Sequence, residues 1–536
     1  MNKRQGNGLR MVGAAALCAA VIAGSGGAAF AEHQRGRWLA GDFHNHTFLT
    51  DGSNLQSEVL EHAFQFGLDW IANSEHGGAY NRNTQGLAWP ADTEFLGNPP
   101  AGKMWRWQSL WQYSFPIISA ARSSWPDKLI VQGYEWNVPT HEHASVAIVG
   151  PAEQGGKAIA QHEYLFDGSD SGTTSDGYLG VSGKLANSHE KAVAGAVWLE
   201  DNFPKASYFL LNHPSRALKY TIADIRDFNN AAPDVAFGFE GIPGHQKESA
   251  RGGYSGSSEL ARTYGGADYM IARVGGLWDA LLGEGRHFYT FVDSDFHSTG
   301  GDFWPGEYAK SYTFAPDEDC DGSISPRELL DGLRSGNSFA VHGDLINALQ
   351  FTARANDGRS FAEQERHREK RRLRVHEREA AMGGELQLNK GGDVTLKIRF
   401  RSPAMNNNGD PVAVDHIDLI AGAVTGKVGR YLADGVTLNP AYDKDTNEST
   451  KVIATFTRGD FEKDDDGFLT VTYRLKNVKN AMYFRLRGTN LPPNTPNETD
   501  AAGNPLIDDL VGPNTAAKAY ADLWFYSNPI FVTVSR

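Results

Sequence analysis

The sequence predicts an α/β domain followed by an all-β domain. Short apolar runs in the first 350 residues repeatedly end in histidine, aspartate or glutamate, as do the strands of α/β barrels where they gather their chemistry. From residue 391 to 536 the pattern changes to short alternating segments separated by turns rich in Asn, Asp and Gly, which is typical of a β-sandwich. Between the two, residues 351–390 include a dense run of mixed charges that indicates a solvated linker.

The first 31 residues have the pattern of a secretory signal peptide. Three basic residues precede an apolar run from Met11 to Gly24, and Ala29-Phe30-Ala31 supplies a small-x-small cleavage pattern. The apolar run is too short to span a bilayer. The sequence therefore predicts a secreted or periplasmic protein that is cleaved near Ala31 and has no membrane anchor.

The composition limits the classes of partner. The formal net charge of the 536-residue chain is −14, and it becomes −17 once the three cations of the signal are removed. Such a surface repels nucleic acid and anionic membranes, so no nucleic-acid partner is expected. With 40% hydrophobic and 22% charged residues, the chain has the composition of a globular protein of two or three domains. Cleavage would leave only Cys320, which excludes an intramolecular disulfide.

Each element of the α/β domain, expected over residues 32–350, has a local justification. A strand over 37–43 precedes His44, and a helix over 54–66 carries an apolar stripe at helical spacing and stops at Gly67. Further strands are expected over 69–73, 129–136, 144–150, 208–211, 236–239, 287–292 and 308–314, with a helix over 326–334. In the all-β domain, strands are expected over 394–400, 415–421, 469–475 and 530–534.

Two stretches interrupt this alternation and are interpreted as insertions. Residues 80–127 contain five tryptophans, and exposed loops rarely keep so many indoles unburied, so a small core of their own is expected rather than an aromatic substrate wall. Residues 152–190 are rich in Gly, Ser and Asp and predict a loop over the mouth of the barrel. His162 and His189 in this loop are expected to be solvated.

A pair of histidines two residues apart opens the series of candidate metal ligands. His44 and His46 follow the first strand, and alternate residues of an extended chain point to one side, so both imidazoles can face one ion. Asp51 follows in a short turn. A single His-x-His is equally consistent with polar residues on an exposed edge, but later strand ends favour a metal site. The further candidates are His76, Glu135, His143, His213, Asp295 and His297.

Together these residues resemble the polymerase and histidinol phosphatase (PHP) family over residues 38–345. The candidate ligands occur in family order and at family-like strand ends. The resemblance implies a distorted (β/α)7 barrel that binds two or three divalent ions (Zn, Mn or Fe). With its predicted sandwich, the chain is similar to a secreted branch whose known members include carbamate-cleaving metallohydrolases.

The resemblance also implies how the ligands are shared. His44, His46, Glu135 and Asp295 would hold one ion, Glu135 would bridge to a second held with His143 and His213, and Asp51, His76 and His297 would hold a third. Glu135 and Asp295 are therefore the expected catalytic residues. Asp51 stands where the family often has histidine, so the third site is expected to be weaker or to prefer a harder ion such as Mn²⁺. Glu75 also departs from the usual aspartate, and His141 competes with His143 for one role.

The implied chemistry is hydrolysis of a small-molecule ester by a metal-activated hydroxide, with a phosphomonoester or phosphodiester favoured. A carbamate or another carboxylic ester or amide is the alternative substrate class. A non-catalytic metal-binding module is less favoured, since all nine positions carry metal-competent side chains. Arg216 and Lys219 are candidate phosphate anchors, although surface cations on a loop are the more ordinary interpretation.

An Asp-rich stretch near residue 320 matches a calcium-loop pattern. Asp317, Asp319, Asp321, Gly322 and Glu328 have the spacing of D-x-D-x-D-G-x5-E. The same residues also fit the start of a helix, because Ser325-Pro-Arg-Glu328 forms a capping box. The two interpretations are compatible, and we expect a structural Ca²⁺ here.

Overall fold

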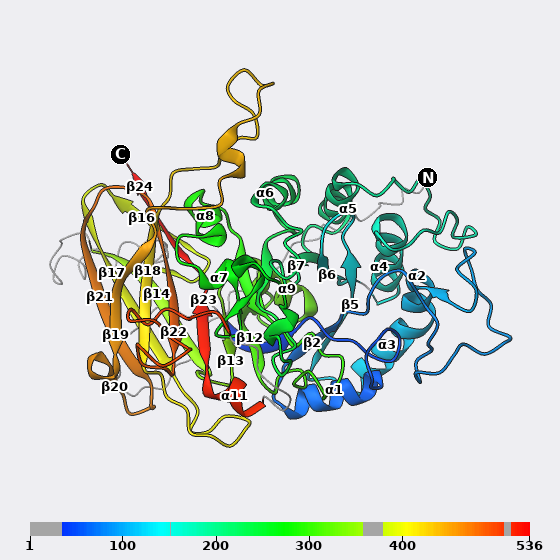
Figure 1. Cartoon of the computed structure of the whole chain (residues 1–536), viewed down its shortest axis with the longest axis horizontal. Coiled ribbons are helices and arrows are strands. Elements are labelled where there is room, and N and C mark those ends of the chain that lie inside the picture. The colour runs from blue at the N-terminus through cyan, green and yellow to red at the C-terminus, as the bar shows by residue number, and fades with distance from the viewer. Residues whose placement is uncertain (1–34, 151, 357–378, 509–515, 536) are drawn as a thin grey trace, which may run out of the picture. The chain divides into compact units, whose positions relative to one another are not determined.

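The computed structural model describes residues 35–150, 152–356, 379–508 and 516–535. The fold is mixed α/β with one large sheet and a second β-rich region, as Figure 1 shows. The predicted signal peptide and the centre of the predicted linker, residues 357–378, lie outside the described residues. Among the described helices, none is both long and apolar enough to cross a bilayer.

Six parallel strands form the N-terminal part of the large sheet. They are β1 (Gly36–Asp42), β2 (Trp70–Asn73), β5 (Leu129–Asn137), β7 (Ser207–Leu211), β8 (Gly238–Ile242) and β11 (Tyr289–Val292). The antiparallel strand β6 (His143–Ile148) lies between β5 and β7. On the other side, β1 pairs with the antiparallel strand β12 (Ala309–Pro316), which pairs with β13 (Ser338–His342). All eight strand predictions in this part lie within a few residues of these bounds.

The order of these strands explains why polar residues gather at one edge. Parallel strands bring their carboxyl ends to the same edge of a sheet, and an antiparallel strand brings its first residue there. His44 therefore follows the end of β1, Glu135 lies near the end of β5, and His143 begins β6. His213 follows β7 and Asp295 follows β11 in the same way.

The sheet curves until its first strand, β11, approaches β12, but the last gap is bridged by side chains. Ser311 Oγ on β12 accepts a hydrogen bond from Val292 N (2.7 Å) and donates one to Val292 O (2.8 Å). Asn528 binds the backbone of Thr290 in the same way. Its Oδ1 accepts a hydrogen bond from Thr290 N (2.8 Å), and its Nδ2 donates one to Thr290 O (3.3 Å). The edge of β11 is thus satisfied without a backbone ladder.

Helices connect and cover the parallel strands. The longer ones are α1 (Gln56–Gln65), α3 (Phe115–Ser124), α4 (Ala152–Phe166), α5 (His189–Asn202), α6 (Ile222–Ala231), α8 (Leu277–Gly283) and α9 (Pro326–Ser335). Both α6 and α9 begin at capping boxes, Thr221 with Asp224 and Ser325 with Glu328.

Two expectations for the insertions need correction. Residues 152–166 form helix α4 rather than a loop, and Gly156 within it lets the helix pack closely, since a Cβ there would lie 2.6 Å from the ring of Phe115. The expected small core exists in part, because Trp89 packs with Met104, Phe95 and Tyr113 in a separate cluster. Trp105 and Trp107 instead join the main hydrophobic core.

The β-rich region continues the large sheet rather than standing apart from it. Strand β13 pairs with β23 (Trp524–Ser527), and the order runs on through β22 (Met482–Thr489), β18 (His416–Ala423) and β19 (Lys451–Thr457). Strands β24 (Ile530–Ser535) and β16 (Glu385–Asn389) extend it. A separate sheet contains β14 (Ala348–Asn356), β15 (Glu379–Ala381), β17 (Gly392–Arg401), β20 (Glu462–Lys463) and β21 (Leu469–Val478).

The predicted linker is therefore too long at both ends. Strand β14 covers residues 348–356, and Leu349, Phe351 and Ala353 alternate inward and are buried. Strands β15 and β16 occupy residues 379–381 and 385–389. This alternation is the usual signal of a half-buried strand, and in the sequence it lies directly beside the charged run.

Candidate metal centre

Glu135 lies at the centre of a cluster of imidazoles. Its Oε1 lies 3.1 Å from His44 Nε2, 3.0 Å from His143 Nδ1 and 3.3 Å from His213 Nε2. Its Oε2 lies 2.6 Å from His76 Nδ1 and 3.5 Å from His46 Nε2. One buried carboxylate therefore faces five histidines that come from four strand ends.

Two aspartates complete the cluster on either side. Asp295 Oδ1 lies 3.0 Å from His44 Nε2 and 3.2 Å from His46 Nε2. Asp51 lies at the solvent side, with 48% of its side chain exposed, and its oxygens are 3.2 Å from His76 Nε2 and 3.4 Å from His297 Nε2. The structure thus brings all nine predicted ligands together: His44, His46, Asp51, His76, Glu135, His143, His213, Asp295 and His297.

The hydrogen bonding of these groups fits bound cations. Both ring nitrogens of His46, His44 Nδ1, His143 Nδ1, His213 Nδ1 and Glu135 Oε2 are buried without a hydrogen-bond partner among the described residues. Buried polar atoms are normally satisfied, and leaving so many unsatisfied in one place is costly. Imidazole nitrogens and carboxylate oxygens are ligands for Zn²⁺, Mn²⁺ and Fe²⁺, so the donor set matches the ions that the sequence resemblance implied.

The electrostatics of the cluster depend on mutual contacts. Burial by itself would raise the pKa of Glu135, but the neighbouring His143, His76 and His44 outweigh it and hold this pKa well below its usual range. Partial burial would likewise raise the pKa of Asp51, but hydrogen bonds from His297 and His76 lower it strongly. Both carboxylates are therefore ionised at neutral pH, the state in which they bind cations.

Buried acids behind the ligands hold the imidazoles in place. His44 Nδ1 faces Asp293 Oδ1 at 3.6 Å and Glu240 Oε2 at 3.7 Å. Glu240 Oε2 also accepts a 2.6 Å hydrogen bond from His213 N. Further below, burial raises the pKa of Asp42 to about 7. Carboxylates behind metal-binding histidines fix the orientation of the ring and strengthen its basicity.

Strained backbone accompanies the site. His213, His245 and Asp295 have φ values of 29°, 54° and 40°, in a region that residues other than glycine rarely adopt. Such strain persists where surrounding contacts fix the conformation, and it clusters at functional sites. With these backbone conformations, His213 Nε2 lies beside Glu135, and Asp295 Oδ1 lies beside His44 and His46.

The sequence interpretation missed His245, which lies directly against the cluster. His245 Nε2 is 3.0 Å from Asp295 Oδ2, and its Nδ1 is 2.6 Å from Asp302 Oδ1. Asp302 Oδ2 also accepts from His297 N at 2.6 Å. His245 lies three residues after β8, the same spacing as His76 after β2, but the predicted strand ends at residue 239, and the polar residue directly after that end is Glu240.

Other residues singled out in the sequence have different positions from those expected. Arg216 is not a surface cation, because only 23% of its side chain is exposed and its guanidinium lies 3.7 Å from Asp295 Oδ2 and 3.0 Å from Glu142 Oε1. Lys219 is more exposed and pairs with Glu142. Glu75 is buried and accepts from Thr47 N at 3.0 Å, so it holds the loop that carries Asp51. His162 is buried rather than solvated.

The Asp-rich loop forms the start of α9. Glu328 Oε1 accepts from Glu318 N (2.7 Å) and its Oε2 accepts from Ser325 N (2.8 Å). Asp317 Oδ2, Asp319 Oδ1 and Asp321 Oδ1 accept from backbone N–H groups of the same loop. These contacts agree with the capping interpretation, and the calcium interpretation stays a prediction.

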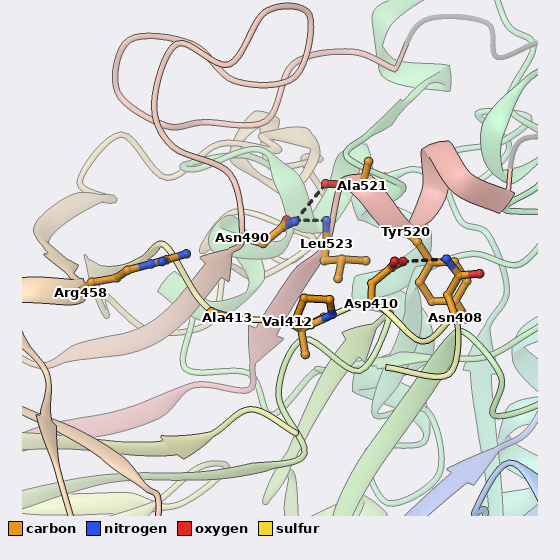
Figure 2. Close-up of a pocket in the computed structure, with 10 residues that line it drawn as sticks. Asn408, Asp410, Val412, Ala413, Arg458, Asn490, Tyr520, Ala521 and Leu523 are labelled. Carbon is orange, nitrogen blue, oxygen red and sulfur yellow. Dashed lines mark hydrogen bonds between the residues drawn. The ribbon is translucent and has the colours of Figure 1, made fainter. Parts of the chain in front are cut away.

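A pocket of about 640 Å³ lies in the β-rich region, away from the candidate ligands. Figure 2 shows Asn490 turned toward Ala521 and Leu523, and Asp410 bonded to Asn408, while Arg458 lies apart. The side chains of Asn408, Asp410 and Asn490 in this pocket are therefore occupied by local contacts. None of the nine predicted ligands lines it.

Comparison with known proteins gives only remote similarities. No family model and no curated protein matches the sequence. Similar solved structures include a two-domain protein from Bacteroides vulgatus containing a predicted PHP-like metal-dependent phosphoesterase, with 13% identity and a TM-score of 0.33 over 88% of this chain and 94% of that one. PsfC from Pseudomonas syringae has 13% identity and a TM-score of 0.28 over 55% and 96% of the two chains.

Endonuclease Q, in complex with duplex DNA carrying an abasic lesion, has 11% identity and a TM-score of 0.28 over 56% of each chain. Similarity at these levels decides neither substrate nor partner, including the expected absence of a nucleic-acid partner. The function is therefore argued from the cluster of histidines and carboxylates itself.

Proposed function

We propose that this protein is a metal-dependent hydrolase with phosphoesterase activity. We also propose that its α/β domain is a distorted (β/α)7 barrel of the PHP type. The observation that carries the proposal is the position of Glu135. It lies within 3.5 Å of nitrogens from five histidines, next to buried nitrogens that have no partner among the described residues.

The residues would share two or three ions through common carboxylates. His44, His46, Glu135 and Asp295 would hold one, Glu135, His143 and His213 a second, and Asp51, His76 and His297 a third. When bound, divalent ions would lower the pKa of a coordinated water toward neutrality and stabilise the negative charge on the phosphoryl and leaving-group oxygens. The exposed Asp51 marks the side from which substrate reaches the site.

The chain's own side chains orient the ligands. Asn212 Nδ2 donates to Glu135 Oε1 at 3.0 Å, which fixes the rotamer of the central carboxylate. Asn212 Oδ1 in turn accepts from Ser145 N at 3.0 Å, so the amide cannot turn over. His245 is a positioning residue of the same kind, because Asp302 holds its ring against Asp295.

Arg216 supports a phosphoester over a neutral ester. Its guanidinium lies 3.7 Å from Asp295 Oδ2 and is partly open to solvent. A guanidinium matches two oxygens of a phosphate and stays charged at every relevant pH. In this position Arg216 would orient a phosphate that reaches the ions, whereas a carbamate or acetate offers no second anionic oxygen to it.

Metal analysis combined with three substrates tests the proposal. The purified protein should contain more than one equivalent of transition metal and hydrolyse nitrophenyl phosphate or bis-nitrophenyl phosphate. Glu135→Gln should lose more than about 100-fold in kcat/KM, because it removes the shared ligand. Glu462→Gln, the same change on the exposed strand β20, is the matched control. Activity on nitrophenyl acetate with none on either phosphate would replace the phosphoesterase with the carboxylic-ester alternative.

We further propose that the protein acts outside the cytoplasm. The support is the charged, apolar and small-residue order of residues 1–31. Intact mass measurement of the protein from the extracytoplasmic fraction of an expressing bacterial host tests this. A chain beginning near Glu32 is expected, and a full-length chain retained in the cytoplasm would contradict it.

A further inference from the structure

A second group of metal-binding side chains lies outside the centre around Glu135. His141, His189 and Asp224 each offer one donor atom, and these atoms lie within 4.8 Å of one another. The three residues come from the β5–β6 turn, the first turn of α5 and the first turn of α6. His141 therefore does not take the place of His143 as a ligand beside Glu135, because its neighbours are different.

Hydrogen bonds on the outer side of each ring determine which nitrogen faces inward. His141 Nδ1 lies 2.9 Å from Lys219 O, and a carbonyl only accepts, so Nδ1 carries the proton. His189 Nε2 lies 3.2 Å from Asp227 Oδ2, which is likewise an acceptor. Each imidazole therefore has an outer-side acceptor, the arrangement found behind metal-binding histidines.

The two inward nitrogens face each other at close range. His141 Nε2 and His189 Nδ1 are 2.9 Å apart. With their outer nitrogens protonated, neutral rings direct two lone pairs at the same point, and these repel unless a proton or a cation lies between them. Asp224 Oδ1 lies 3.5 Å from His189 Nδ1, while Asp224 Oδ2 is already used by Thr221 N and Oγ1. One carboxylate oxygen is thus left for the same point.

Aromatic packing holds the rings in these orientations. His141 stacks on Tyr220 with ring centroids 5.3 Å apart and an angle of 8°. Phe228 packs edge-on against His141 at 5.6 Å and contacts His189 at 5.5 Å. On the other side, 24% of the His189 side chain and 19% of Asp224 are exposed, so water can reach the point between them.

We propose that His141, His189 and Asp224 bind a single divalent cation of the Zn²⁺ type, separate from the ions of the Glu135 centre. Two imidazoles, one carboxylate and a water make a four-coordinate set that suits Zn²⁺. The role is structural, since the ion joins the β5–β6 turn to the starts of α5 and α6. That turn also carries Glu142, which contacts Arg216, and His143, which contacts Glu135.

Metal content in variants with a weakened Glu135 centre tests the proposal. The variant Glu135→Gln/Asp295→Asn, loaded with Zn²⁺ alone and dialysed, is compared with the same protein carrying His189→Gln as well. Native mass spectrometry should show one Zn²⁺ more on the first protein than on the second, whatever the third group Asp51, His76 and His297 retains in both. His62→Gln in the same background is the matched control, because His62 lies in α1, stacks on Trp304 and belongs to neither cluster, and it should leave the metal content unchanged.

A spectroscopic measurement distinguishes the ion from a shared proton. With Co²⁺ in place of Zn²⁺, the background variant should show a visible absorption band that disappears with His141→Asn and with His189→Gln. Equal metal content with and without His189→Gln, or a Co²⁺ spectrum indifferent to both histidine changes, would overturn the proposal and leave a His–His hydrogen bond. Failure of the phosphoesterase assay would not affect this result, because no activity is measured.

Discussion

Two regions of the molecule bury charged side chains in opposite ways. Around Glu135, histidines and carboxylates crowd together with many polar atoms left without partners among the described residues. Between α8 and the β-rich region, Arg485 instead makes two hydrogen bonds to Asp279, of 2.8 and 2.7 Å, with both side chains fully buried. Arg487 and Asp418 form a pair at 2.6 Å through one nitrogen. Each of these arginines has its carboxylate partner, although Arg485 Nη1, Arg487 Nε and Arg487 Nη1 have no hydrogen-bond partner among the described residues.

The difference separates function from stability. A buried ion pair with both partners present stabilises itself, and removing one partner is strongly destabilising. A buried cluster that leaves several polar atoms without a hydrogen-bond partner is expensive unless a ligand binds to them. Four measurements test this comparison. They are given in order of decreasing expected effect.

Arg485→Met should destabilise the fold by about 3–5 kcal/mol, because it leaves the Asp279 carboxylate buried without its cation. The free energy of unfolding in urea measures this. In the folded protein at low temperature, kcat for the phosphate substrate should be unchanged. The double variant Asp279→Leu/Arg485→Met should recover part of the loss. A selective fall in kcat would show that the matched pair also serves the site.

Glu240→Gln should weaken metal binding by about 10–100-fold with little effect on the free energy of unfolding. The carboxylate faces His44 and accepts from His213 N, so its charge acts through two predicted ligands. Titration of the metal-free protein with Mn²⁺ or Zn²⁺ measures the affinity. Glu200→Gln, on α5, is the control. Unchanged affinity in Glu240→Gln would remove these buried acids from the metal centre.

His162 offers a buried histidine with both nitrogens satisfied. Nδ1 accepts from Tyr134 OH at 2.8 Å, Nε2 donates to Gly195 O at 3.3 Å, and burial lowers the pKa of this imidazole to about 3. Between about pH 3 and pH 6.5 the unfolded chain therefore binds more protons at this residue, so stability falls as pH falls, by up to about 1.4 kcal/mol per unit.

The pH dependence of unfolding should therefore be shallower in His162→Gln than in the wild type across this range. Tyr134→Phe removes the hydrogen-bond donor without changing the titrating ring, and its slope should stay that of the wild type. Equal slopes for His162→Gln and the wild type would mean that His162 is protonated in the folded state.

The Asp-rich loop should give the smallest effect. If it binds Ca²⁺ as its spacing predicts, 1 mM Ca²⁺ should stabilise the chelated protein by about 1 kcal/mol or less, since single exposed calcium loops bind weakly. Asp319→Ala should abolish the shift in melting temperature, and Asp331→Ala on α9 should not. No shift in the wild type would leave the capping box as the whole function of these residues.

Much of the centre could be predicted because the end of a strand can be recognised from the residues next to it in the sequence. Short apolar runs before His44, His76, His213 and Asp295 identify strands, and parallel pairing then brings their ends together. His245 was not found because β8 ends at Ile242, three residues later than the predicted end, and this histidine lies three residues beyond the true end. Its strained turn and its long-range contact with Asp302 have no signature at a single position.

The domain boundary was less predictable than the site. The change from helical to alternating patterns near residue 391 is real, yet the hydrogen bonds between β13 and β23 carry the large sheet across it. Pairing between strands distant in sequence depends on which edges remain open after folding, and a local pattern does not record that. His141 and His189 were misjudged for the same reason, since their partners lie on separate segments.

Asn528 links the β-rich region to the strand that carries Asp295. It occupies both backbone groups of Thr290, a residue 238 positions earlier, at the open edge of β11. A chain cut before residue 528 would lack these two hydrogen bonds in the strand that precedes Asp295. The β-rich region therefore belongs to the scaffold of the candidate metal centre, and truncation near residue 391 would not isolate a complete one.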